Sequence, residues 1–301
     1  MSGGISVGNC RKEGIISRAA VYSALAVLSF AMLFPVVYMF TNSFMDKKEA
    51  LQTFQVSTQS NDEEAPIQTS YRVKFKLIPE KVSLMQYYSV LLKEPRFLYM
   101  FWNSVILTVP IIFGQLIIST LAAYAFGKLK FPFRDRIFFI YIIVMLMPFQ
   151  VTLVPNYIML KSMNMLNSYL SVILPGIFAT FGVFLLRQFI ANIPDEYCEA
   201  GKIDGAGYFK VFARIVLPQC KGPVASLCIL VFIDNWSMVE QPLIFLEDSS
   251  MHPLSVFLSM INRDDMGIAF ACGFLYMIPA LLVFLYGESY FIEGIQLSGI
   301  K

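Results

Sequence analysis

Six apolar stretches, each about long enough to cross a lipid bilayer, dominate this sequence. They lie at Ala19–Asn42, Met100–Phe126, Ile137–Pro155, Tyr169–Ile190, Val224–Leu246 and Ile268–Phe291. Soluble domains carry about 25% charged residues, whereas this chain has 15% charged and 57% hydrophobic residues and a mean hydropathy of +0.63. The first stretch is too long for a signal-peptide core, so we expect it to remain as an anchor. The sequence therefore predicts an all-α membrane protein with six transmembrane helices.

The placement of lysine and arginine predicts how these spans are oriented. Basic residues gather in the N-terminal tail (1–18), in the loop after the second stretch and in the loop after the fourth. The alternate short loops hold only Lys161 and Arg263. We therefore expect both termini, including the tail 292–301, in the cytoplasm. The segment 43–99 is expected outside despite its basic residues, because long segments cross largely regardless of charge.

The predicted outer segment, 43–99, changes character along its length. A polar run from Thr53 to Ser70 is followed by alternating polar and apolar residues from Tyr71 to Leu77. Such alternation is typical of a strand. Two interpretations stay open: a disordered loop, or an ordered cap that contacts an extracellular receptor.

The segment 192–223 separates two apolar stretches and is too charged to lie in lipid. Pro194 suits the first turn of a helix, and Asp195 and Glu196 place negative charge at the positive end of its dipole. The pair Asp204-Gly205 predicts a turn. The segment is therefore expected to begin with a short helix that ends at a tight turn.

A second short helix is expected after that turn. Its apolar residues recur at three- and four-residue spacing: Phe209, Phe212, Ala213 and Val216. Pro218 and Pro223 prevent this helix from continuing straight into the next span. Three interpretations fit such an element: a solvated loop, a helix lying on lipid headgroups, or a docking element whose exposed aromatics fill a pocket in another protein.

This segment resembles the cytoplasmic loop signature of ABC importer permeases, written E-A-A, three residues, G, nine residues, I-x-L-P. The positions that carry the resemblance are Glu199, Ala200, Gly201, Asp204, Gly205, Ala206, Phe209, Phe212, Ile215, Leu217 and Pro218. Gly201 departs from the pattern, where the family usually has alanine, and is expected to loosen the helix by up to about 1 kcal/mol without changing its role.

The resemblance also implies a role for the segment. In such permeases this loop inserts into a groove on a separate ATPase. Glu199 is then the expected charge partner of a basic residue on the ATPase, Phe209 and Phe212 are the expected apolar anchors, and Gly205 allows the tight turn. We expect ATP-driven closure of the ATPases to rock the spans between inward and outward openings.

A second motif lies in the third apolar stretch. Pro148 and Pro155 must break or kink a helix there, which lipid tolerates only where the freed backbone groups face protein or water. The run from Leu146 to Tyr157 resembles the M-x-P-x-Q-V-x-x-I-P-x-Y pattern of carbohydrate-importer permeases. Gln150 and Tyr157 are therefore candidate pathway residues, and the resemblance as a whole extends from Asn103 to the C-terminus.

A polar cluster, Asp234-Asn235-Trp236, is expected near the middle of the fifth span. A carboxylate at that depth costs about 2.5–3.5 kcal/mol, so it should face a bundle interior or a wet cavity. An aromatic ring beside an amide and a carboxylate suits a sugar, but a buried structural cluster fits equally well. The family commonly has Asn-Asp after this tryptophan, whereas Ser237 and Met238 follow here.

Other candidates for the pathway are weaker. Glu240 and Gln241 precede a proline along the same expected wall. Tyrosines in the spans, which are more often packing or interface residues, are Tyr38, Tyr141 and Tyr157.

The sequence offers no pattern for catalysis, metal binding or nucleic-acid binding. No G-x-x-x-x-G-K-[ST] motif is present, so we expect no phosphate-binding loop and no cofactor in this chain. The five cysteines form no C-x-x-C pair: Cys10, Cys198, Cys220, Cys228 and Cys272. The only histidine, His252, is expected to be solvated in an outer loop. We therefore expect that this chain is not an enzyme.

Taken together, the resemblance implies a subunit of a bacterial inner- or plasma-membrane importer for a sugar or oligosaccharide, similar to the maltose-type permeases. The implied partners are a second homologous permease, two ATPase subunits that hold ATP and Mg, an extracellular or periplasmic sugar-binding protein, and membrane lipid. The C-terminal residues 294–301 resemble a tail that reaches between the ATPases, although a frayed terminus fits as well.

Two other classes remain as alternatives. An ion-coupled secondary transporter would need acidic residues in several spans, or broken helices repeated in two halves. A membrane scaffold would explain the hydrophobicity but not the loop signature.

Overall fold

The structure, a computed structural model, describes residues 7–54, 56–59, 68–71, 76–93, 95–261 and 266–299. The chain divides into two compact units, Met1–Lys93 with Asn262–Phe274, and Glu94–Ile261 with Leu275–Lys301. Within the described residues, four helices are long and apolar enough to cross a membrane, and six spans result if each of two bent helix pairs is one span. This agrees with the predicted all-α, six-span fold.

The first unit contains helix α1 (Val7–Asn42), whose residues 21–42 form one candidate span. No side chain in the apolar window of this span is buried, as suits a helix that faces lipid. Near its end, the ring of Phe40 lies 4.9 Å from that of Phe274, in the part of helix α15 (Met266–Gly299) that belongs to the same unit. Since α15 continues to Gly299, residues 292–299 are helical.

The remainder of the first unit consists of short elements. They are α2 (Lys47–Phe54), strands β1 (Val56–Gln59) and β2 (Gln68–Tyr71), α3 (Met85–Tyr88) and the π-helix η1 (Ser89–Lys93). The strands pair antiparallel, with Val56 opposite Tyr71. Of the strand predicted at 71–77, Tyr71 is in β2, residues 72–75 lie outside the described residues, and Lys76 and Leu77 are not in a strand, so the prediction is wrong at its C-terminal end. Instead, the Lys76 ammonium bridges the carboxylates of Glu49 and Glu80, at 2.6 and 2.7 Å.

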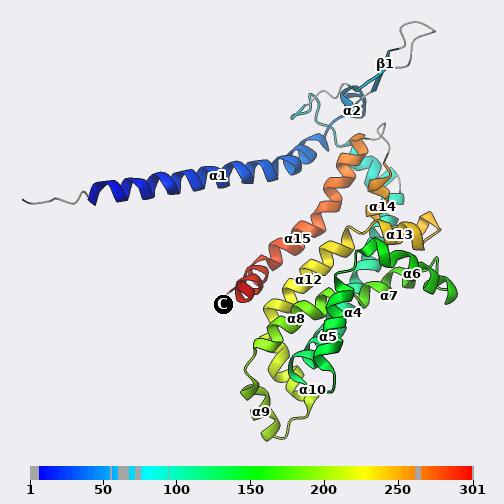
Figure 1. The fold of residues 1–301 in the computed structure, drawn as a ribbon. Helices are drawn as coiled ribbons and strands as arrows, with labels where there is room; N and C mark the ends of the chain where they lie inside the picture. The colour runs from blue at the N-terminus through cyan, green and yellow to red at the C-terminus, as the bar shows by residue number, and fades with distance from the viewer. Residues whose placement is uncertain are drawn as a thin grey trace, which may run out of the picture. The chain divides into compact units, whose positions relative to one another are not determined.

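The second unit is organised around the long helix α4 (Arg96–Lys128). Figure 1 shows it beside three other helices that pack on it, α7 (Tyr169–Ile177), α8 (Phe181–Asn192) and α12 (Lys221–Trp236). The contacts bury apolar side chains completely, among them Leu107, Ile111, Leu186 and Leu227. The apolar face of α4 therefore fixes the positions of α8 and α12, between which the segment 192–223 lies.

Two spans of the second unit are sharply bent. Helices α5 (Arg134–Met145) and α6 (Phe149–Ser162) meet at 101°. Pro148 is the N-cap of α6, which confirms the predicted break. The second bend, of 78°, lies at Cys220, between residues 208–219 and α12.

The predicted fifth span, Val224–Leu246, is not one helix. Helix α12 ends at Trp236, where the Ser237 hydroxyl donates a hydrogen bond to the Ile233 carbonyl at 2.8 Å. The chain resumes in the short α13 (Glu240–Phe245), followed by a 3-10 turn, η3 (Ser249–Met251), and α14 (Leu254–Ser259). Asp234 therefore lies in the last turn of α12 rather than in the middle of one continuous helix.

A buried hydrogen-bond network closes the N-terminal end of α4. The Asn103 amide donates to the carbonyls of Ser250 and His252, at 2.7 and 3.0 Å, and accepts from the Tyr169 hydroxyl at 2.8 Å. The His252 ring is only 8% exposed, and its Nε2 lies 2.9 Å from the Leu246 carbonyl oxygen. The prediction of a solvated His252 is therefore wrong, because this ring fastens the loop that follows α13.

Candidate coupling site

The segment 192–223 folds as a helical hairpin, which excludes an unstructured loop. It contains α9 (Asp195–Ile203), α10 (Tyr208–Val211), the π-helix η2 (Phe212–Val216) and α11 (Leu217–Gln219). Gly205 has a φ of +77°. The N–H of Ala206 donates to the Gly201 carbonyl at 2.9 Å, and that of Gly205 to the Lys202 carbonyl at 3.0 Å. These are the two bonds of a Schellman cap, so the turn predicted at Gly205 is confirmed.

One face of the hairpin is part of the core. Val211 and Val216 are fully buried, and Phe212 is only 6% exposed. The ring of Phe212 packs against that of Tyr124 on α4, with centroids 5.3 Å apart. The expectation that Phe212 is an exposed anchor is therefore wrong, since its ring already fills a site between the hairpin and α4.

Gly201 allows the two arms of the hairpin to approach closely. A Cβ atom added at this position would lie 2.6 Å from Cδ1 of Ile215 on η2. The expected effect of this glycine, a looser helix with no change of role, is therefore incomplete: the missing methyl group makes room for Ile215.

The opposite face of the hairpin exposes large apolar side chains beside the Gly205 turn. The exposed fraction is 86% for Ile203, 74% for Phe209 and 62% for Tyr208. We call these three residues the apolar platform. Exposed apolar clusters of this kind mark surfaces that another molecule covers. Glu199, on the same helix as Ile203, is also exposed.

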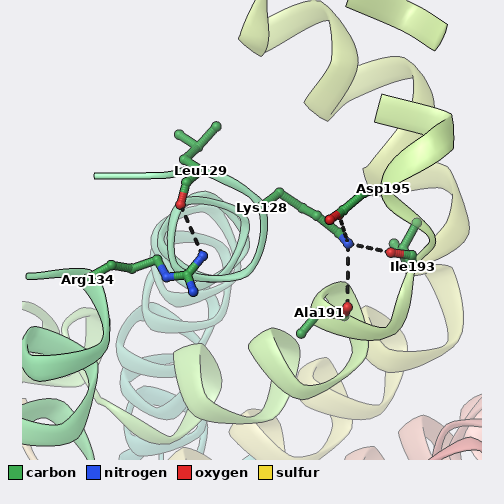
Figure 2. Close-up of polar contacts among 6 residues, drawn as sticks. All are labelled: Lys128, Leu129, Arg134, Ala191, Ile193 and Asp195. Atoms are coloured by element: carbon green, nitrogen blue, oxygen red, sulfur yellow. Dashed lines mark hydrogen bonds and ion pairs between the residues drawn. The ribbon is translucent and has the colours of Figure 1, made fainter. Parts of the chain in front are cut away.

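A buried lysine fastens the base of the hairpin to the bundle (Figure 2). The ammonium of Lys128, at the C-terminal end of α4, donates to the Asp195 carboxylate at 2.7 Å, to the Ala191 carbonyl at 3.4 Å and to the Ile193 carbonyl. The side chain of Lys128 is only 4% exposed. One cation therefore joins the end of α4, the end of α8 and the start of α9.

The charge of Lys128 also acts on its neighbours. Its hydrogen bond and its positive charge hold the pKa of Asp195 below the ordinary value. Burial raises the pKa of the Cys198 thiol, which faces the core from α9. Asp195 therefore stays ionised beside Lys128 at neutral pH, whereas Cys198 stays protonated.

The structure places the predicted loop residues in three environments. Exposed are Glu199, Ala200, Asp204, Gly205, Phe209 and Pro218; partly buried are Ala206, Ile215 and Leu217; buried are Gly201 and Phe212. The residues of the signature therefore lie on both the exposed and the buried face of the hairpin.

The predicted pathway residues do not form a single cluster. Gln150 on α6 lies next to Glu240 on α13, with its amide nitrogen 3.4 Å from the carboxylate, and both side chains are exposed. Tyr157 is partly buried, and the Lys161 ammonium lies 5.9 Å from its ring centre. Asp234 is exposed on this chain.

Asn235 and Trp236 are occupied by contacts within the chain. The Asn235 amide donates to the Val231 carbonyl at 2.8 Å. The Trp236 ring is 4% exposed and stacks with those of Phe232 and Tyr276, and its indole N–H donates to the Tyr276 carbonyl at 3.1 Å. Trp236 therefore holds α12 against α15, which favours the structural interpretation of this cluster over a sugar-stacking role.

Known proteins identify the family of this chain. Residues 91–288 match the model of a family described as binding-protein-dependent transport system inner membrane component. The chain belongs to this family. It is therefore a multi-pass membrane protein and the permease component of a transport system.

Similar permeases have been named in several bacteria. The arabinooligosaccharides transport system permease protein AraQ of Halalkalibacterium halodurans is 29% identical over 209 residues, which cover 68% of this chain and 75% of that protein. The sn-glycerol-3-phosphate transport system permease protein UgpE of Yersinia enterocolitica is 32% identical over 201 residues, covering 65% and 72%. These relatives are transport permeases.

The fold is shared with a solved transporter. A chain in the crystal structure of a bacterial ABC transporter involved in the import of the acidic polysaccharide alginate superposes with a TM-score of 0.74. The match covers 96% of this permease and 100% of that chain, at 20% identity. The likeness supports the permease fold.

Sequence reasoning missed two features of the permease site. In the sequence, Lys128 is one of the basic residues in the loop after the second apolar stretch, and a lysine directly at the end of a long apolar span is a signal for a helix-terminal anchor. Ile203 and Tyr208 flank Gly205, and their apolar character beside a turn could have indicated the platform. Among the described residues, no group of three or more His, Cys, Asp or Glu side chains could hold a metal ion.

Proposed function

We propose that this permease forms half of the translocation pathway of an ATP-driven importer for a sugar or oligosaccharide. The named relatives support the substrate class, because they include a permease for arabino-oligosaccharides. A second, homologous permease forms the other half. An extracellular or periplasmic sugar-binding protein delivers the substrate.

The apolar platform carries the proposal, as the contact with a separate ATPase. Ile203, Tyr208 and Phe209 project from a hairpin whose other face is built into the core. An apolar patch on a rigid element fits a groove in a partner protein, because little conformational entropy is lost on docking. Glu199 lies beside it, where its carboxylate can pair with a basic residue of the ATPase.

The contacts of the hairpin explain how a movement of the ATPase reaches the spans. The Lys128 ammonium joins α9 to the ends of α4 and α8. The buried residues of η2 join the returning arm to the same bundle. A displacement of the platform is therefore passed to the bundle through packed groups rather than through a flexible loop.

The remaining parts of the proposal follow from this arrangement. Two ATPase subunits hold ATP and Mg and carry out the hydrolysis, while this chain has no catalytic role. The platform faces the cytoplasm, and both termini lie on the same side. The basic residues in the loop after α4 and in the hairpin after α8 support this orientation.

Charge reversal of Glu199 tests the contact with the ATPase. In proteoliposomes that contain the assembled importer, we expect Glu199→Lys to abolish ATP-dependent sugar uptake while membrane insertion is unchanged. The matched control is Glu196→Lys, which makes the same charge change at another exposed position of α9. Normal uptake by Glu199→Lys would contradict the proposed role.

The energy source is tested separately. Uptake should persist in the presence of an ionophore and stop when ATP is removed. The reverse result would identify an ion-coupled transporter and overturn the proposal. Copurification of an ATPase with the wild-type chain, but not with Phe209→Ser, would further support the platform as the contact.

A further inference from the structure

A basic cavity lies where the chain passes from α4 into α5. It has a volume of about 540 Å³ and is lined by Lys130, Phe131, Phe133, Arg134, Asp135 and Arg136. Phe133 adopts a left-handed conformation, with a φ of 62°, directly before α5. The proposed coupling function uses none of these residues.

The cavity has more positive than negative charge. Its lining contains three cationic side chains and one carboxylate. That carboxylate, Asp135, already contacts two guanidinium groups, Arg134 at 3.1 Å and Arg187 at 3.8 Å. Among the residues that the structure describes, Lys130 and Arg136 form no ion pair. Two cations at the cavity are therefore available to an anionic group.

The surroundings of the cavity are aromatic and then apolar. The Arg136 guanidinium lies over the Phe133 ring, 5.4 Å from its centre, and Phe133 is exposed. One turn further along α5, the side chains of Ile137 and Ile140 are also exposed. Aromatic residues with Lys and Arg beside an apolar helix are typical of the membrane–water interface. A ligand at this position therefore meets cations at one end and lipid-facing side chains at the other.

We propose that this cavity binds the phosphate of an anionic phospholipid headgroup, with the acyl chains lying along the exposed apolar face of α5. Lys130 and Arg136 supply the positive charge, and the Phe133 ring borders the glycerol region. Basic pockets at the ends of transmembrane helices are known to take such headgroups. A soluble phosphate ester would contact the cations but not the apolar face of α5. An acidic surface of a partner protein would likewise need only the cations. The proposal requires only that the chain spans a membrane, and it does not depend on the ATPase contact.

Lipid binding can be measured on the purified full-length chain in its importer complex. The probes are phosphatidylglycerol and phosphatidylcholine with identical acyl chains, titrated in detergent and followed by native mass spectrometry. We expect wild type to prefer phosphatidylglycerol. Each charge near an anionic lipid contributes about fivefold in affinity, so Lys130→Gln with Arg136→Gln should bind phosphatidylglycerol roughly thirtyfold more weakly.

Two variants control for the position and for the charge. Lys161→Gln removes an exposed lysine from α6 and should leave the preference unchanged. Arg136→Lys keeps the charge and should retain most of the affinity. Because both neutralised side chains contact solvent, the double variant should fold, and its helical circular dichroism must match wild type.

Several results would overturn the proposal. Equal binding of the two lipids by wild type would do so, as would unchanged phosphatidylglycerol binding by the double variant. Competition by glycerol phosphate at the same concentration as the lipid would show that the acyl chains contribute nothing, and would assign the cavity to a soluble phosphate ester. Loss of the ATPase from the double variant, with lipid binding intact, would assign it to a protein contact.

Discussion

Each end of α4 is joined to neighbouring segments by one buried side chain, but the chemistry of the two contacts differs. At the N-terminal end, the neutral amide of Asn103 joins two backbone carbonyls and the Tyr169 hydroxyl inside the core. At the C-terminal end, the ammonium of Lys128 joins two backbone carbonyls and the Asp195 carboxylate. Each side chain is buried and has three partners, but only the second uses charge.

The difference between a neutral and a charged contact predicts how easily each end of α4 can open. A buried neutral network is costly to open, because every member then loses its partner in a dry environment. The Lys128 end includes a largely exposed carboxylate, with a side chain that is 70% exposed. Water can replace Lys128 as the partner of Asp195, so we expect this end to open at a lower cost in free energy than the Asn103 end.

The largest effect is expected at the neutral end. Asn103→Ala leaves the Tyr169 hydroxyl and the carbonyls of Ser250 and His252 without their partner, which should lower the free energy of unfolding by about 3 kcal/mol. Denaturant titration of the purified permease measures this loss. Asn192→Ala, at an exposed position, should have little effect. A similar loss of unfolding free energy in both variants would show that the buried contacts of Asn103 have no special role.

A smaller loss of stability but a larger loss of coupling is expected at the charged end. Lys128→Met leaves the Ala191 and Ile193 carbonyls and Asp195 without a cation, at a cost of about 2 kcal/mol. Amide hydrogen exchange should become faster throughout α9, and sugar uptake per ATP hydrolysed should fall. Lys161→Met, at an exposed position on α6, should leave the exchange of α9 unchanged. Unchanged exchange in Lys128→Met would show that this lysine does not hold the hairpin.

A pair of glycine substitutions isolates the turn from its anchor. Gly205→Ala places a side chain at a φ of +77°, which should cost about 1 kcal/mol and expose the last turn of α9 to exchange. Gly207→Ala makes the same chemical change where φ is −69°. Neither added Cβ would meet another atom within 4 Å. Equal effects at the two positions would show that backbone conformation is not the cause.

The smallest effect is a dependence on pH. Since the pKa of Asp195 is lowered in the folded chain from its ordinary value of 3.8, the stabilisation by its pair with Lys128 is complete above about pH 4 and is lost as pH falls through the lowered pKa. Amide exchange in the first turn of α9 should therefore accelerate, relative to the rest of the helix, only below about pH 4. Asp195→Asn should lack this acid step, and an identical pH profile in both proteins would contradict the assignment.

The features that were predictable from the sequence depend on single residues and their own backbone. Pro148 breaks a helix because it lacks an N–H, and Gly205 ends one because it accepts a positive φ. The apolar spans followed from length and composition for the same reason, since lipid excludes unpaired backbone groups locally.

The features that were not predictable depend on distant partners. Phe209 and Phe212 look equivalent in the sequence, yet Phe212 packs on Tyr124, whose position is set by α4. Between them the chain enters the π-helix η2, whose wider turn alters which side chains face the core. Trp236 likewise stacks with and donates a hydrogen bond to Tyr276, forty residues later in sequence.

The 78° bend at Cys220 has a mechanical consequence. The two helical segments that meet there, residues 208–219 and α12, are almost perpendicular, so together they act as a bent lever. A force along the segment that begins at Tyr208 mainly rotates α12 sideways. It moves α12 little along its own axis. The rotation displaces α12 most at its far end, where Trp236 is clamped to Tyr276. Under the proposed coupling, a push is converted into a rotation of α12, and the helices on which α12 packs, α4 and α8, must follow it together with the part of α15 around Tyr276.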